Sequence, residues 1–378
     1  MGIVKRENLA LSEVQGTVSP TLAKGERFVT LDGLRGVAAI AVALFHLDAS
    51  LMPGGYLAVD FFFVLSGFVL IRTYEPRFKT GLGIARFMLI RSVRLYPLYA
   101  VGIAIGTAFA LQGLLRGSEY HMAGSKFLGG LFFNTLMLPS PLSRELFPFN
   151  GPAWSLFFEI LASLALVIIL TKMRTFALAI LALVAGVSLT VAAYHFQHTS
   201  GGLQLLSEGE AATSAGAYWD GWYVGLLRTA FSFTTGAVIA RLPTAVDRPS
   251  KMSAAFCLII LVLLLFAAVP LEKRIAYDIA CILIFSPVLV FAGSRIEPQQ
   301  LVVPAAAMAG ELSYALYAIH LPIAHACQFA ARRAGLSNFA IAPVYLLISL
   351  ALAWLCVRYV DLPMRQMLSE KLIRKRNN

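Results

Sequence analysis

Charged residues are scarce in this sequence. Asp, Glu, Lys and Arg make up only 13% of the 378 residues, whereas hydrophobic residues make up 58% and the mean hydropathy is +0.75. These proportions exclude an ordinary soluble domain, in which about a quarter of the residues are charged and about half are apolar. The long apolar runs are near the roughly 20 residues that cross a hydrocarbon core, and they predict a membrane protein.

Cysteine is scarce as well. We expect buried small side chains at these positions, and neither a metal site nor a bound cofactor. Residues 1–28 also lack the apolar core of a signal peptide, so we interpret them as a poorly ordered cytosolic leader. Each cysteine lies inside an apolar run, without a CxxC pair or a metal-binding spacing: Cys257, Cys281, Cys327 and Cys356.

The apolar runs define the fold class. A shorter apolar stretch at 127–138 is too short to cross a membrane, and we assign it to a re-entrant or interfacial segment. We predict an all-α polytopic membrane protein with about ten transmembrane helices, one membrane domain over residues 29–360 and no appended soluble domain. The predicted spans are 33–52, 55–74, 95–115, 153–172, 175–195, 219–240, 252–270, 278–293, 305–327 and 340–358.

The distribution of the basic residues predicts the orientation. The net charge of +11 raises the question of nucleic-acid binding, but most of the 31 Lys and Arg residues fall between the apolar runs. Ten alternating spans place the basic clusters 72–94, 241–251 and 365–376 on one side. Positive charge is retained on the cytosolic side, so we expect both termini there, a basic cytosolic tail at 361–378 and no nucleic-acid partner.

Ionisable residues inside the spans are the first functional candidates, because an unpaired charge in lipid is costly. Arg35 and His46 lie eleven residues apart in the first span. On a helix they are about 16 Å apart along the axis and within roughly 20° of one face. Alternatively, the Arg reaches the interface and the His bonds to a core neighbour. The candidates are Arg35, His46, Asp48, Asp60, Glu159, Arg228, Asp278, Glu311 and His320.

Asp60 is the candidate partner of His46. The first two spans are antiparallel, so the two residues reach similar depth, and the carboxylate can orient the imidazole or keep it basic. The alternative is an Asp60 at the outer interface that contacts water or the surroundings of Asp48. Arg228, in the middle of its span, needs an anionic partner, for which Glu159 is the first choice.

Two further groups of polar residues share helix faces. Arg91 and Arg94 are neighbours before the third span, an arrangement that suits phosphate oxygens or, alternatively, anchors the helix at lipid headgroups. Ser155 and Glu159 share a face of the fourth span, and the ninth span places three side chains on one face: Ser313, Tyr317 and His320.

Two of these positions have other interpretations. His320 is alternatively a packed core residue. Ser66 lies in LSGF without a GxSxG elbow, so we do not expect a hydrolase nucleophile there.

Five segments together resemble a known family, the membrane-bound acyltransferase family 3. Its pattern of Arg, ten residues and His is matched by Arg35 and His46, and its RxxR element by Arg91 and Arg94. The family includes acyltransferases of O-antigen, peptidoglycan, exopolysaccharide, Nod factor and macrolides. The segments, in chain order over about 29–360, are LDGLRGVAAIAVALFH, GYLAVDFFFVLSGFVL, RSVRLYPLY, PAWSLFFEI and SYALYAIHLPI.

The resemblance implies about ten helices in a bacterial inner membrane, a cytosolic acyl-CoA donor and His46 at the centre of the chemistry. Acetyl-CoA is the commonest donor expected, and the acceptor is a hydroxyl of a surface or exported glycan or glycolipid. Family members often carry a C-terminal SGNH-type domain. This chain ends at Asn378, so we expect that module, and any second transfer step it performs, to be absent.

A mechanism follows from these assignments. Arg35, Arg91 and Arg94 bind the CoA phosphates, and neutral His46, aligned by Asp60, is the general base. A covalent acyl-imidazole is the variant. Glu159 positions the acceptor or pairs with Arg228. We assign His46, Asp60, Glu159 and His320 to catalysis, and Arg35, Arg91, Arg94, Arg228, Ser155 and Tyr317 to substrate binding.

Two points stay open at this stage. The oxyanion donor is Ser155, Tyr317, His320 or Arg228, and the sequence does not choose among them. The competing functions are a transporter or flippase of a lipid-linked glycan, in which the buried charges line a pathway, and an acyltransferase that modifies a small molecule.

Overall fold

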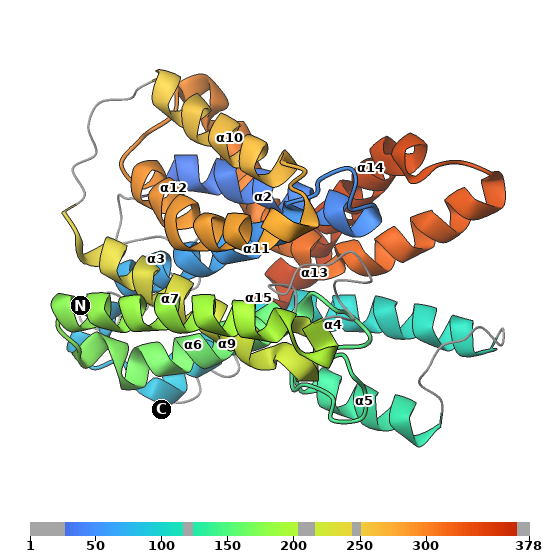
Figure 1. The fold of residues 1–378 in the computed structure, drawn as a ribbon, viewed down its shortest axis with the longest axis horizontal. Helices are drawn as coiled ribbons and strands as arrows, with labels where there is room; N and C mark the ends of the chain where they lie inside the picture. Colours follow the sequence, from blue (N-terminus) through green and yellow to red (C-terminus); the bar gives the residue numbers. More distant parts are fainter. Residues whose placement is uncertain (1–26, 116–123, 203–215, 244–250, 369–378) are drawn as a thin grey trace, which may run out of the picture.

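The computed structural model describes residues 27–115, 124–202, 216–243 and 251–368. These ranges are almost entirely helical and contain no β-strand (Figure 1). The principal helices are α2 (Val29–Leu47), α3 (Ala58–Lys79), α4 (Ile84–Leu115), α5 (Ser125–Thr135), α6 (Ala153–Ile168), α7 (Thr175–Gln197), α9 (Trp222–Arg241), α10 (Lys251–Phe266), α11 (Leu271–Ala280), α12 (Ser286–Gly293), α13 (Val303–Ala334), α14 (Asn338–Cys356) and α15 (Leu362–Leu368).

Parts of three predicted segments fall outside the described residues. These parts are 1–26 of the predicted leader, 244–250 of the basic cluster at 241–251, and 369–378 of the predicted basic tail. The described start of that tail is helical, in α15.

The structure confirms an all-α polytopic membrane protein, but not the count of ten spans. Within the described ranges, eight helices are long and apolar enough to cross a membrane. The predicted spans 153–172 and 252–270 correspond to shorter helices, Ala153–Ile168 and Ala254–Phe266. Sixteen helical residues extend only about 24 Å, less than the roughly 30 Å of a hydrocarbon core. With 11 residues, α5 is also too short to cross.

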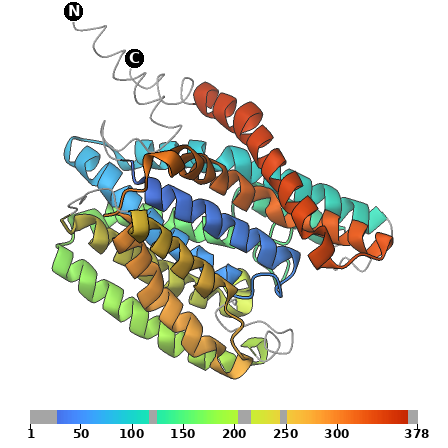
Figure 2. The ribbon, with the colours of Figure 1, turned by 90° about the horizontal axis from the view of Figure 1, so that it is seen from above.

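Close backbone approaches fix how the helices pack. The most extensive contacts join α2 to α13 and α3 to α9. A Cβ atom on Gly67 of α3 would collide with the carbonyl oxygen of Phe233 on α9, and one on Gly236 of α9 with that of Val64. Lipid tails are as apolar as the core, so close packing of this kind holds membrane helices together. Figures 1 and 2 place α7 and α14 at opposite edges of the bundle.

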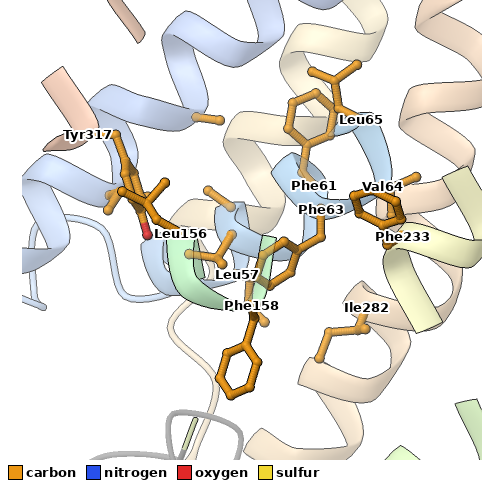
Figure 3. Close-up of a cluster of buried hydrophobic side chains, with 14 of the residues drawn as sticks. Leu57, Phe61, Phe63, Val64, Leu65, Leu156, Phe158, Phe233, Ile282 and Tyr317 are labelled. Carbon is orange, nitrogen blue, oxygen red and sulfur yellow. The ribbon is translucent and has the colours of Figure 1, made fainter. Parts of the chain in front are cut away.

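Buried hydrophobic side chains of α3, α6, α9 and α13 belong to one core cluster (Figure 3). Phe61, Phe63 and Val64 of α3 pack with Phe233 of α9, and Tyr317 of α13 lies at one edge near Leu156 of α6. Three of the four cysteines, all free, are buried as predicted, whereas Cys356 is partly exposed. The core therefore holds α3, α6, α9 and α13 in fixed rotation about their axes.

Candidate active site

His46 lies near the end of α2 and contacts a second histidine. Its Nδ1 is 2.9 Å from the carbonyl oxygen of Val42 and 3.2 Å from Nε2 of His320. The two rings meet edge to face with centroids 4.8 Å apart. Nδ1 of His320 is in turn 2.7 Å from the carbonyl oxygen of Tyr317. The histidines of α2 and α13 thus form a linked pair, with His320 fully buried and His46 partly exposed.

The predicted contact between His46 and Asp60 is wrong. Asp60 forms a two-point ion pair with Arg228 of α9, with oxygen–nitrogen distances of 3.1 Å to Nε and 2.5 Å to Nη2. Both side chains are almost completely buried. Asp60 and Gly67 are seven residues apart and share a face of α3. Because Gly67 packs directly on α9, Asp60 faces Arg228 instead of the imidazole.

The predicted pairing of Glu159 with Arg228 is also wrong, because Asp60 is the partner of Arg228. Oε1 of Glu159 accepts hydrogen bonds from Nη2 of Arg91 at 2.5 Å and from the hydroxyl of Ser66 at 3.0 Å. These two hydrogen bonds join α6 to α4 and to α3. Arg91 is buried, and its Nε lacks a hydrogen-bond partner. The two predicted acid residues therefore have arginine partners from different helices.

The polar face predicted on α13 is confirmed. The hydroxyl oxygens of Tyr317 and Ser155 are 2.6 Å apart, and each lies within hydrogen-bond distance of the carbonyl oxygen of Pro152. One turn away, the hydroxyl of Ser313 accepts from Nη2 of Arg35 at 3.1 Å. A single face of α13 thus contacts Arg35, Ser155 and His46 in succession.

Two cavities border this face of α13. The first, the inner cavity, has a volume of about 100 Å³ and is lined by Arg35, Ser66, Arg91, Arg94, Ser155, Glu159, Ser313 and Tyr317 among others. The second, the outer cavity, is about 1080 Å³ and is lined by His46, by the α4 residues from Gly106 to Gly113 and by the α13 residues from Leu321 to Arg333. Among the described residues, Val59 and Tyr317 are the two that line both cavities.

The end of α2 beside His46 is anchored by a carboxylate outside the membrane spans. Oδ1 of Asp48 accepts from the backbone N–H of Ser50 at 2.9 Å and from its hydroxyl at 2.7 Å, and Oδ2 accepts from Asn338 at 3.1 Å. These hydrogen bonds favour the ionised form and lower the pKa of Asp48. They join the end of α2 to the start of α14.

Sequence reasoning missed two contributors to the site. Ser66, considered only as a hydrolase nucleophile, lines the inner cavity and bonds Glu159. Trp154 lines the outer cavity and lies 5.5 Å below the guanidinium of Arg228. For Ser66 the signal was available: a hydroxyl in an apolar helix needs a partner, and Ser66 is six residues from Asp60 on a neighbouring face.

Comparisons with known proteins place the chain in a family. A family model described as an acyltransferase domain matches residues 28–358. The chain therefore belongs to this acyltransferase family, as the resemblance implied, and is an integral membrane acyltransferase. This finding agrees with the transfer of an acyl group from an acyl donor as the reaction class.

Individual relatives cover less of the chain. It is 36% identical to "Protein 2 in picA locus" of Rhizobium radiobacter over 155 residues, which are 36% of this chain and 80% of that protein. It is 30% identical to peptidoglycan O-acetyltransferase OatA of Listeria monocytogenes over 129 residues, which are 30% of this chain and only 21% of that protein. No solved structure shows a significant match.

Proposed function

We propose that this membrane acyltransferase transfers an acyl group, most simply acetyl, from acyl-CoA to a hydroxyl of a surface or exported glycan. The observation that carries the proposal is the meeting of two cavities at Tyr317, with arginines around one and His46 in the other. The Listeria relative, named a peptidoglycan O-acetyltransferase, supports an acetyl group and a polysaccharide acceptor.

The inner cavity is the proposed donor side. We place this cavity and both termini on the cytosolic side of a bacterial inner membrane, because the cavity holds Arg91 and Arg94 of the basic cluster 72–94 and membrane proteins retain positive charge on that side. The outer cavity then opens on the far side of the inner membrane, where exported glycans are found. Its larger volume suits a polymeric acceptor.

Arginines of the inner cavity would bind the phosphates of CoA. Glu159 holds Arg91, whereas no acidic side chain among the described residues forms an ion pair with Arg94. The neighbouring arginines Arg91, Arg365 and Arg35 each have a carboxylate within ion-pair distance, namely Glu159, Asp361 and Asp32, so Arg94 is the cation of this group that is available to an anion. Guanidinium groups bind phosphate oxygens in a two-point manner, which suits this cluster to a phosphorylated donor.

The hydrogen bonds of the two histidines define which nitrogen can act as a base. A carbonyl oxygen only accepts, so Nδ1 of His320 carries a proton for Tyr317 O, and Nε2 of His320 has the lone pair. Nδ1 of His46 therefore donates to Nε2 of His320 and to Val42 O. Nε2 of His46 keeps its lone pair for the outer cavity. His320, rather than Asp60, is the positioning residue for the proposed base.

Direct transfer follows from this geometry. The acceptor hydroxyl gives its proton to Nε2 of His46 while its oxygen attacks the thioester carbonyl carbon. Tyr317 or Ser155 turns a hydroxyl proton from Pro152 O to the developing oxyanion. The carbon–sulfur bond then breaks, and the proton passes from His46 to the CoA thiolate. A positioned base contributes roughly 10²–10⁴-fold and an oxyanion donor roughly 10²–10³-fold.

The test uses membranes that contain wild type, His46→Ala or Arg94→Ala, with labelled acetyl-CoA and mass spectrometry of the surface glycans. We expect His46→Ala to lower kcat at least about a hundredfold and Arg94→Ala to raise mainly the KM for acetyl-CoA. His198→Ala, at an exposed histidine of the α7 terminus, is the matched control and should behave as wild type. Unchanged glycan acylation in both variants at equal protein level would overturn the proposal.

The role of His320 has a separate test. His320→Gln keeps an acceptor and a donor at similar positions, whereas His320→Ala removes the hydrogen bond to His46. We expect kcat to fall in His320→Ala and to recover partly in His320→Gln, with an unchanged KM for acetyl-CoA. A purely structural role predicts equal losses of protein level and of activity in both variants.

A further inference from the structure

The mouth of the outer cavity carries an excess of positive charge. Of its lining residues in the described ranges, only Glu145 is acidic, whereas four are arginines. The charge of Arg228 is balanced by Asp60. Arg274 is tied to the wall by hydrogen bonds to the carbonyl oxygens of Val269 and Pro53. Arg332 and Arg333 remain as exposed cations at the mouth.

Carboxylates of the described residues do not neutralise the charges of Arg332 and Arg333. No acidic side chain in the described part of the chain forms an ion pair with either of them. Arg333 lies with its guanidinium carbon 4.8 Å above the ring of Phe329, which also lines the cavity. Cations near the end of a helix gain about 0.3–1 kcal/mol from its dipole, and that gain does not require them to line a cavity. Binding of a polar or anionic ligand, by contrast, requires these cations to line a cavity.

Positive charge is also unusual on this side of the membrane. In the orientation proposed above, the C-terminal end of α13 lies outside, where membrane proteins carry fewer Lys and Arg residues. Arg332 and Arg333 depart from that bias at a cavity. Guanidinium groups bind carboxylate and phosphate oxygens in a two-point manner. The charge at the cavity mouth therefore matches an anionic acceptor.

The position of the arginines indicates which part of the acceptor carries the charge. Arg332 follows His320 by twelve residues on α13, a distance of about 18 Å along the helix axis. Aromatic side chains line the cavity between these levels, among them Phe109 and Phe329. A single sugar ring does not extend from His46 to Arg332. The charged group thus belongs to another unit of the acceptor than the hydroxyl that is acylated.

We propose that the acceptor carries a carboxylate or phosphate group that Arg332 and Arg333 bind while a distant hydroxyl lies at His46. This inference deepens the function proposed above and rests on it. The anionic group has two possible sources: acidic sugars within the glycan or the phosphate of a lipid carrier. Both have the same oxyanion chemistry, and the experiment separates them.

The test measures binding to purified full-length His46→Ala protein, so that it does not depend on turnover. The probes are an oligogalacturonate, its neutral methyl ester and a polyprenyl phosphate-linked disaccharide. We expect the charged probe of the correct source to bind at least about tenfold more tightly than the methyl ester, and the preference to weaken as salt is added. Adding Arg332→Gln and Arg333→Gln together should abolish the preference.

Lys126→Gln is the matched control, because it removes one exposed positive charge beyond the end of α4 and does not line the outer cavity. It should keep the full preference for the charged probe. Preference for the oligogalacturonate assigns the charge to the glycan, and preference for the lipid-linked probe assigns it to the carrier. Equal or absent binding of charged and neutral probes, or a preference that survives Arg332→Gln with Arg333→Gln, would overturn the inference. Absence of acyl transfer activity in the wild-type protein would instead count against the proposed function.

Discussion

Among the arginine–carboxylate pairs that join helices in the described residues, the two that border the candidate site differ in their surroundings. In the pair of Arg228 and Asp60, both carboxylate oxygens accept hydrogen bonds from the guanidinium, and the side chains are 1% and 0% exposed. In the pair of Arg91 and Glu159, one oxygen accepts both hydrogen bonds, and the side chains are 4% and 15% exposed. The first pair, called here the closed pair, uses both carboxylate oxygens of Asp60, although Arg228 also lines the outer cavity, whereas the second, the open pair, uses one oxygen of Glu159 and borders the inner cavity.

The difference separates a structural pair from one that is available to a substrate. In the closed pair both carboxylate oxygens accept hydrogen bonds from the guanidinium, and the side chains of Asp60 and Arg228 are buried where α3 packs on α9. The open pair keeps unused hydrogen-bonding capacity, including Nε of Arg91, beside Arg94 and Arg35 in the inner cavity. We therefore expect mutation of the closed pair to lower mainly the stability of the protein, and mutation of the open pair to weaken mainly the binding of the acyl donor.

Asp60→Ala should have the largest effect on stability, because it removes the carboxylate that forms a two-point ion pair with the buried guanidinium of Arg228. We expect a loss of about 3–5 kcal/mol in the free energy of unfolding. The measurement is the unfolding transition of the protein in detergent micelles. The double variant Asp60→Leu with Arg228→Met removes both charges and should recover much of this loss. If the double variant is as unstable as Asp60→Ala, the closed pair is not the cause.

Glu159→Ala should have a smaller effect on stability and a clear effect on donor binding. The inner cavity can hydrate the released Arg91, so we expect a loss of roughly 1–3 kcal/mol in stability. The displaced guanidinium should raise the KM for acyl-CoA about tenfold, as measured in steady-state kinetics. A loss of stability equal to that of Asp60→Ala, with an unchanged KM, would remove the distinction between the pairs.

Ser66→Ala keeps the open pair and removes only one of its hydrogen bonds. A hydrogen bond to a charged group is worth roughly 1.5–3 kcal/mol when fully buried, and the partly exposed Glu159 should show about 1 kcal/mol. We expect the KM for acyl-CoA to rise by about fivefold at most. Ser66→Thr, which keeps the hydroxyl, is the matched variant, and an identical KM rise in both would attribute the effect to packing.

Asp48 gives the smallest expected effect, because neutral donors hold this carboxylate at a partly exposed site. Its pKa in the folded protein is lowered below 3.8, so its contribution to stability is present above that value and is lost as the pH falls through the folded pKa. Asp48→Asn should lower stability by less than about 1 kcal/mol at neutral pH. Unfolding midpoints of wild type and variant should converge as the pH falls through the folded pKa of Asp48, and a constant difference would contradict this.

Much of the architecture could be predicted because it depends on local sequence. The apolar runs predicted the helices, and the helical period predicted which residues share a helix face. Ser313, Tyr317 and His320 lie on one side of α13, as their spacing requires. Arg35 and His46 likewise lie on α2 at the levels of the two cavities. Two of the ten predicted spans correspond to helices that are too short to cross, because flanking turn residues are also apolar.

The partners of the charged residues could not be predicted, because they depend on how each helix is rotated against its neighbours. Spacing placed His46 and Asp60 at similar depth, but the rotation of α3 directs Asp60 to Arg228. That rotation is set by the contacts of Gly67 and Gly236, where two backbones approach without side chains between them. Gly67 lies seven residues after Asp60, and this spacing was the signal in the sequence that Asp60 lies on the face of α3 that packs on α9.

The narrow separation of the two cavities has a consequence for the permeability of the membrane. Val59 and Tyr317 line both cavities, so in the proposed orientation they form part of the barrier to ions between the two sides of the membrane. Tyr317 also holds its position through hydrogen bonds to Ser155 and Pro152. In the orientation proposed above, the packing of Tyr317 and Val59 therefore contributes to the seal that keeps protons from crossing the membrane between the two cavities.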